Sequence, residues 1–187
     1  MPTSEQQIIH RVSALVAADS VSSPDPRWDS SNRKVIHHIA EYAEGDGWAV
    51  EIQELGSGAN TKANLIASLG DCCEAGGQPS GLVLSGHTDT VPFDAGGWDS
   101  DPLTLDERDG RLYGLGSTDM KGFFAVALEA AAAFDPKEFK SPLYLLATAD
   151  EESTMRGARS LTRDYLPQAR AAVVGEPTDL RPMRMHK

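Results

Sequence analysis

Side chains that could do chemistry occur at four points of this sequence, three of them directly after an apolar run and one at the end of a glycine-rich loop. At the first, His87 and Asp89 stand two residues apart after the apolar residues 82–86. Residues two apart on extended backbone point to the same face. Asp89 can therefore accept the N–H of one imidazole nitrogen and leave the other free to bind a metal ion. The alternative is a polar turn in which both side chains face solvent.

The second point is a glycine-rich loop that ends at Asp119 and leads into an apolar helical stretch. One interpretation is a first-turn carboxylate at a helix start. In the other, the two oxygens of Asp119 bridge a pair of metal ions about 3.5–4 Å apart, and Gly114, Gly116 and Gly122 permit a tight backbone path. Neither a dinucleotide fingerprint nor a Gly-Lys-Ser/Thr phosphate loop is completed here, so nucleotide binding is not expected.

Three adjacent acids, Asp150, Glu151 and Glu152, follow another apolar run and form the third point. Like-charge repulsion makes such a cluster costly unless cations or hydrogen-bond donors compensate it. It is either a solvated helix entrance or a functional group, in which one glutamate binds a metal ion and its neighbour transfers a proton. The fourth point, Glu176, is weaker alone, because a single glutamate before a proline is ordinarily a turn residue.

One histidine and several carboxylates suit divalent ions such as zinc, cobalt or manganese. A covalent mechanism is not expected, because the sequence has no Gly-x-Ser-x-Gly elbow. Its two cysteines, Cys72 and Cys73, are adjacent in a glycine-rich stretch, which matches neither a zinc-ligand spacing nor a disulfide framework.

Apolar strands that alternate with helical stretches must position these residues. The expected strands are 48–52, 63–69, 82–86, 143–149 and 171–174, and the last three are expected to be buried. The expected helices are 4–18, 31–43, 117–134 and 154–166. Residues 70–81 are expected to form a long surface turn. The pattern predicts an α/β fold with a sheet between helices and a site beyond the carboxyl ends of the strands.

Bulk composition excludes several classes of protein. The 187 residues carry 17 Lys and Arg against 28 Asp and Glu, a formal charge of −11 that repels nucleic acid and anionic membranes. With 40% apolar and 24% charged residues, the chain has the composition of a folded soluble α/β protein. Neither a secretory signal nor a membrane span is expected, and a reducing cytoplasm is the expected location.

Taken together, the four motifs resemble the metal-dependent aminoacylase and deacetylase family, which also contains succinyl-diaminopimelate desuccinylase and carboxypeptidase G-type enzymes. The similarity extends over essentially the whole chain and looks closest to the acetylornithine deacetylase branch. The runs that carry it are 86–94, 112–122, 147–152 and 175–178.

This resemblance implies roles for particular residues and two bound divalent ions, zinc or possibly cobalt. The implied metal ligands are His87 and Glu176 on the first ion, Glu152 on the second, and Asp119 as the bridge between them. Glu151 is then the general acid and base, and Asp89 orients the imidazole. A cis peptide bond between Asp119 and Met120 is also implied.

The resemblance further implies hydrolysis of N²-acetyl-L-ornithine to ornithine and acetate, a step of arginine biosynthesis. A related two-metal N-acyl amino acid deacylase or desuccinylase is the alternative. By the same resemblance, residues 1–187 are the N-terminal portion of a three-layer, zinc-peptidase-like catalytic domain, incomplete at the C-terminus. The family's dimerisation domain and a later segment that supplies a further histidine ligand are then absent.

Two expectations follow from that assignment. The second metal site is expected to be incomplete, and the homodimer of full-length family members need not form. The remaining alternative is a non-catalytic fragment that holds one ion through His87, Asp119 and Glu176.

Overall fold

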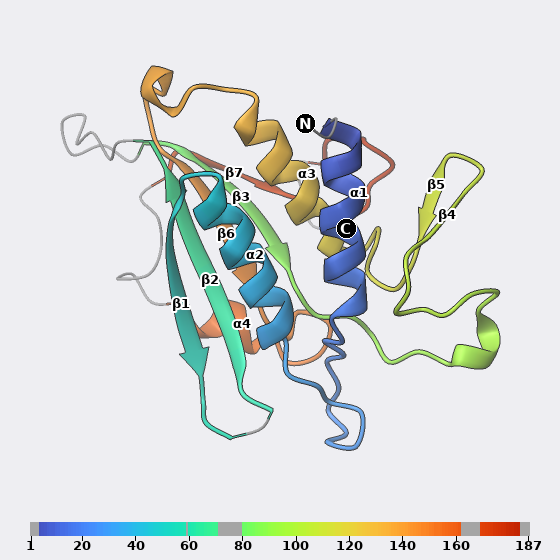
Figure 1. Cartoon of the computed structure of the whole chain (residues 1–187). Helices are drawn as coiled ribbons and strands as arrows, with labels where there is room; N and C mark the ends of the chain where they lie inside the picture. The colour runs from blue at the N-terminus through green and yellow to red at the C-terminus, as the bar shows by residue number, and fades with distance from the viewer. Residues whose placement is uncertain (1–3, 59, 71–79, 162–168, 184–187) are drawn as a thin grey trace.

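A computed structural model describes residues 4–58, 60–70, 80–161 and 169–183 of the chain. A five-stranded mixed sheet forms its centre (Figure 1). β2 pairs antiparallel with β1 and β6, whereas β3 pairs parallel with β6 and β7. In their order across the sheet the strands are β1 (Ala49–Leu55), β2 (Lys62–Leu69), β6 (Leu143–Thr148), β3 (Leu82–His87) and β7 (Ala171–Val174).

Helices cover both faces of this sheet. α2 (Arg33–Gly45) and α3 (Lys121–Ala132) contact the strands on one face, and α1 (Ser4–Ala17) packs against both of these helices (Figure 1). The short α4 (Arg156–Ser160) also contacts β2. A second sheet, the hairpin of β4 (Asp106–Arg108) and β5 (Arg111–Tyr113), projects on the side of α1 (Figure 1). Two 3-10 turns span Ala95–Gly97 and Pro136–Glu138.

Alternation along β2 establishes which helices share a face. Leu65 and Ala67 point into the apolar core together with Phe124 of α3 and Ile36 of α2. Asn64 points the other way and donates a hydrogen bond of 3.0 Å to the backbone oxygen of Gly157 in α4. α4 therefore lies opposite α1, α2 and α3. The predicted three-layer α/β arrangement is confirmed in the described residues.

The helix predicted from residue 117 begins only at Lys121. Residues 117–120 form turns instead, and the amide of Gly122 donates to the backbone oxygen of Gly116 at 3.2 Å. A Cβ at Gly122 would lie 2.1 Å from the backbone oxygen of Ser117. The missing side chain at residue 122 thus lets the loop that carries Asp119 fold back across the helix start.

The prediction of a buried strand at residues 171–174 is wrong about burial. β7 forms, but all four of its residues are exposed, with Val173 and Val174 at 47% and 59%. It is the edge strand in the described part of the sheet, where it pairs with β3 on one side. An apolar sequence indicated the strand correctly, but it does not reveal whether other residues cover it.

Two predictions extend beyond the described residues. Most of the expected turn at 70–81, with Cys72 and Cys73, lies outside them, as does the end of the expected helix 154–166. Of the helices in the described ranges, none is long and apolar enough to cross a membrane.

Candidate metal centre

His87 lies at the carboxyl end of β3, where its side chain is 2% exposed. Its Nδ1 lies 3.0 Å from the backbone oxygen of Asp89 and 3.6 Å from the carboxylate of the same residue. A carbonyl oxygen can only accept, so Nδ1 must be the donor of this hydrogen bond. In the neutral ring, Nε2 then presents a lone pair. That is the orientation in which a histidine binds a metal ion.

Nε2 of His87 faces carboxylates from two other segments. Asp119 Oδ1 lies 3.1 Å from it and Glu176 Oε1 lies 3.9 Å from it. The cis peptide bond implied between Asp119 and Met120 is present. Glu176 follows Gly175, whose backbone N–H donates to the backbone oxygen of Ser85 in β3 at 3.0 Å.

Gly175 is one of the positions where only glycine fits. A Cβ there would lie 2.2 Å from the ring of Phe123 in α3. The missing side chain lets the end of β7 approach α3, and this brings Glu176 to the same end of the sheet as Asp119.

A carboxylate is fully buried directly behind the histidine. Asp89 is 0% exposed, and its two oxygens accept the backbone N–H groups of Glu151 and Glu152 at 3.1 and 3.0 Å. Burial raises the pKa of Asp89, while the nearby His87 and these two N–H groups act in the opposite direction. One side chain therefore links the loop after β3 to the loop after β6.

Glu151 and Glu152 face the histidine from the loop after β6. Burial raises the pKa of Glu152, and the charges of Asp119, Glu151 and Asp89 raise it further, whereas His87 lowers it. Carboxylates crowded in this way favour a bound cation, which would relieve their mutual repulsion.

Two groups of side chains in the described residues have the geometry to hold a metal ion, and within each group the candidate ligand atoms lie within 4.8 Å of one another. The groups are His87 with Asp119 and Glu176, and His87 with Glu151 and Glu152. The structure thus brings all six predicted site residues together. Both groups use the same imidazole, so within the described residues Glu152 has no separate histidine for a second ion.

The donor set fits a divalent cation of the zinc class. An oriented imidazole nitrogen and carboxylate oxygens are ligands that such ions accept. Glu151 and Glu152 belong to the same group, so both carboxylates lie within reach of an ion held by His87.

A cavity of about 690 Å³ opens beside these side chains. Asp119 and Glu152 form part of its wall, and β5 and the glycine-rich loop form much of the rest. The sequence reasoning missed three large side chains that also line it: Trp98, Arg111 and Tyr113. The only sequence signal for them is two aromatic residues beside glycine, which is common in turns. The cavity has the size of a pocket for a small molecule.

Two buried lysines near the site were also missed. Lys121 is 0% exposed, and its ammonium donates to the backbone oxygen of Ala18 at 2.9 Å. Burial lowers the pKa of Lys121 to about 8, although Asp19 and Asp89 act to raise it. Lys62 is 2% exposed. Each lysine is the first residue of a largely apolar element, a position at which a charged side chain is ordinarily exposed.

Residues 83–185 match the family described as peptidase family M20/M25/M40. The acetylornithine deacetylase of Aliivibrio salmonicida (strain LFI1238) is 49% identical over 173 residues, which is 92% of this chain and 43% of that protein. The acetylornithine deacetylase of Pasteurella multocida (strain Pm70) is 46% identical over 175 residues, 94% of this chain and 44% of that protein. The chain thus spans less than half the length of these relatives.

Solved structures agree on the fold. Human carnosine dipeptidase 1 aligns with a TM-score of 0.69 at 23% identity, over 89% of this chain and 38% of that one. An M20 family metallo-carboxypeptidase of Sulfolobus solfataricus aligns with a TM-score of 0.60 at 18% identity, over 81% and 32%. The family match covers more than half of the chain and includes all six candidate residues. The chain therefore belongs to peptidase family M20/M25/M40.

Proposed function

We propose that the protein is a metal-dependent amidohydrolase that converts N²-acetyl-L-ornithine to L-ornithine and acetate. The observation that carries the proposal is the convergence of His87 and carboxylates from three other segments beside a cavity. The substrate rests on the relatives named acetylornithine deacetylase, at 46% and 49% identity.

In this proposal the chain holds two divalent ions, zinc or cobalt. His87 and Glu176 would hold the first ion, Glu152 would hold the second, and Asp119 would be a ligand of both. Bound divalent ions supply Lewis-acid polarisation of the amide carbonyl and lower the pKa of a water ligand.

The proposed reaction uses Glu151 twice. Its carboxylate accepts a proton as water adds to the acetyl carbon, and it returns that proton to the nitrogen as the C–N bond breaks. Ornithine therefore leaves as a neutral amine rather than as an amide anion. Asp89 supports both steps, because it holds His87 and the backbone N–H groups of Glu151 and Glu152.

The proposal extends to the pathway, to the place of the chain in a longer protein and to the assembly, of which the second is supported by the length of the match. We assign the reaction to arginine biosynthesis in the cytoplasm and residues 1–187 to the N-terminal portion of a catalytic domain. A homodimer is the proposed assembly of the full-length enzyme.

A substrate panel tests the proposal. The zinc-loaded protein and its His87→Ala variant are assayed with N²-acetyl-L-ornithine, N-succinyl amino acids, other N-acetyl amino acids and dipeptides. Preferential hydrolysis of acetylornithine that is lost in the variant is the expected result. Preferential hydrolysis of another acyl amino acid would favour the related deacylase or desuccinylase. That second candidate has support from the short match, because the relatives have further residues that can shape the pocket.

A further inference from the structure

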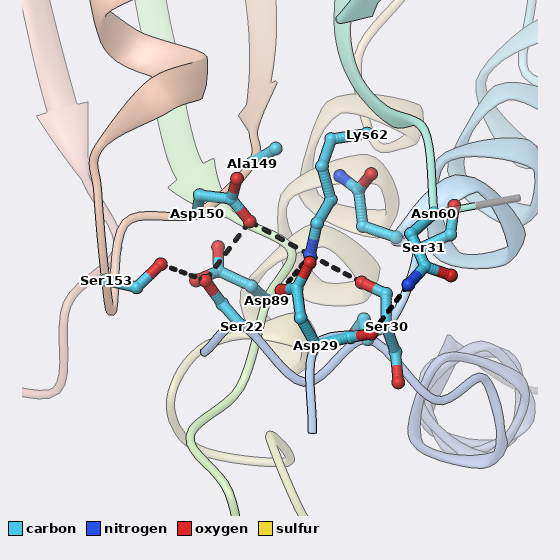
Figure 2. Close-up of polar contacts among 12 residues, drawn as sticks. Ser22, Asp29, Ser30, Ser31, Asn60, Lys62, Asp89, Ala149, Asp150 and Ser153 are labelled. Carbon is cyan, nitrogen blue, oxygen red and sulfur yellow. Dashed lines mark hydrogen bonds and ion pairs between the residues drawn. The ribbon is translucent and has the colours of Figure 1, made fainter. Parts of the chain in front are cut away.

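Lys62, the first residue of β2, has its ammonium group buried among oxygen atoms (Figure 2). Nζ lies 2.8 Å from Asp29 Oδ1 and 3.0 Å from Asp150 Oδ1, and it also donates to the backbone oxygen of Ser30. An ammonium group has three N–H donors. Each of them thus has an oxygen partner, so the charge is buried at a site that is built to hold it.

Asp150, which Lys62 contacts, is the second residue of the loop after β6. Its backbone has a positive φ of 59°, which is uncommon for a residue other than glycine and needs support from its surroundings. That support is visible in Figure 2: Ser22 donates to Asp150 Oδ1 at 3.1 Å, and the hydroxyl groups of Ser22 and Ser153 are hydrogen-bonded to each other. Lys62 and Ser22 thus hold the same carboxylate oxygen.

The residues that follow this turn are the two glutamates of the candidate site. Their backbone N–H groups both point to the carboxylate of Asp89. The turn is therefore held by Lys62 and Ser22 through the Asp150 side chain, and by Asp89 through the amides of Glu151 and Glu152. Rotation at Asp150 would change where both glutamate side chains point.

We propose that Lys62 is a positioning residue of the active site, which acts through Asp150 to direct Glu151 and Glu152 toward His87. This inference rests on the proposed function, because it gives a purpose to the direction of those two side chains. The competing explanation is a purely structural ion pair that joins β2 to the loop after β6.

A second buried ion pair in the same molecule provides a matched control. Arg11 of α1 is 8% exposed and lies 2.9 Å from Asp46 and 3.9 Å from Glu129 of α3. Glu129 lies about two turns along α3 from Lys121. The candidate ligand Asp119 precedes Lys121 by two residues. Arg11→Met therefore breaks a buried pair far from the candidate metal ligands.

The experiment compares Lys62→Met with Arg11→Met and the wild-type protein. Zinc affinity is measured by competition with a chromophoric chelator, and backbone amide exchange is measured over residues 149–155 in the metal-free proteins. Loss of an outer partner of metal ligands typically weakens metal affinity by about 10–100-fold. We expect a loss of that size and faster exchange of these amides in Lys62→Met. Arg11→Met should lower the unfolding temperature but leave zinc affinity and the exchange of residues 149–155 unchanged.

With acetylornithine as substrate, the positioning role predicts a lower kcat with little change in KM, because Glu151 acts in the chemical step. If Lys62→Met does not fold, the same measurements are made on Lys62→Met/Asp29→Asn, which removes one partly buried negative charge together with the positive one. The same loss of zinc affinity is expected in that double variant.

Two failures can be told apart. Zinc binding that depends on His87 but not on Lys62 would overturn the positioning role and leave the proposed function standing. Zinc affinity in the wild-type protein that does not depend on His87 would overturn the proposed function itself.

Discussion

The loops that follow β6 and β7 both carry candidate metal ligands, yet the molecule holds them very differently. The loop after β6 follows a buried strand end and is fastened by Asp89 and Lys62. The loop after β7 follows an exposed edge strand, and its Glu176 lies 3.9 Å from Nε2 of His87. The backbone of Glu151 and Glu152 is therefore held in place by hydrogen bonds within the protein.

We expect this difference to divide the proposed site into a pre-organised half, after β6, and a more exposed half, after β7, that gains order when an ion binds. A cation that binds only the folded state stabilises the groups that contact it. We therefore expect metal binding to change the surroundings of β7 more than those of β6.

The largest expected effect compares the two strands themselves. Leu145 of β6 is 0% exposed, and Leu145→Ala should lower the free energy of unfolding by about 2–5 kcal/mol through the cavity that it leaves. Val174 of β7 is 59% exposed, and Val174→Ala should change it by only about 0.5 kcal/mol. Urea unfolding of the metal-free proteins measures both. Equal losses would contradict the contrast between the strands.

Asp89→Ala tests the fastening of the loop after β6. It removes the acceptor of two backbone N–H groups, and hydrogen bonds to a charged group contribute about 1.5–3 kcal/mol each. A loss of about 3 kcal/mol in the metal-free protein is expected, together with weaker zinc binding. Asp89→Asn keeps one acceptor oxygen and should lose less. If the midpoint of urea unfolding were the same in Asp89→Ala and in the wild-type protein, these hydrogen bonds would not stabilise the fold.

The buried Lys121 near the pre-organised half gives a dependence on pH. Its pKa is lowered from 10.5 to about 8, so between these values the unfolded chain binds more protons than the folded one. The free energy of unfolding of the metal-free protein should therefore rise with pH through this window. The contribution is at most about 3 kcal/mol.

Lys121→Met is the control for that dependence, because it removes the titrating group and keeps an unbranched side chain of similar length. Unfolding is measured at several pH values between 8 and 10.5 in both proteins. The same rise in both would show that other groups cause it.

The smallest effect on stability is expected at Glu176. Glu176→Gln should leave the unfolding of the metal-free protein within about 0.5 kcal/mol of wild type, because this side chain is partly exposed on the β7 side. Zinc affinity should fall clearly in the same variant. Amide exchange measured with and without zinc should show that zinc increases the protection of residues 171–176 more than that of residues 143–148. An equal increase in the two segments would contradict the proposed division of the site.

Much of the site was predictable because its residues follow apolar strands. Parallel strands deliver their carboxyl ends to one edge of the sheet, so His87, Glu152 and Glu176 converge as expected. The partners of Lys62 were not predictable, because Asp29 and Asp150 are distant from it in sequence and only the folded chain brings the three residues together.

Two errors have local physical causes. The helix start was misplaced because residues 117–120 were judged helical, whereas they form turns that the missing Cβ of Gly122 admits beside the helix start. The burial of β7 was misjudged because Val173 and Val174 are equally apolar in a covered and in an edge strand.

The most direct test of a metal centre built around His87 is the zinc affinity of the protein and of His87→Ala, with bound zinc counted by elemental analysis. His87 belongs to both groups of candidate ligands, so its removal should weaken zinc binding by more than the loss of about 10–100-fold that is typical of outer partners. Zinc bound by the wild-type protein and lost by the variant is the predicted result. Equal zinc affinity in the two proteins would contradict the assignment of the site.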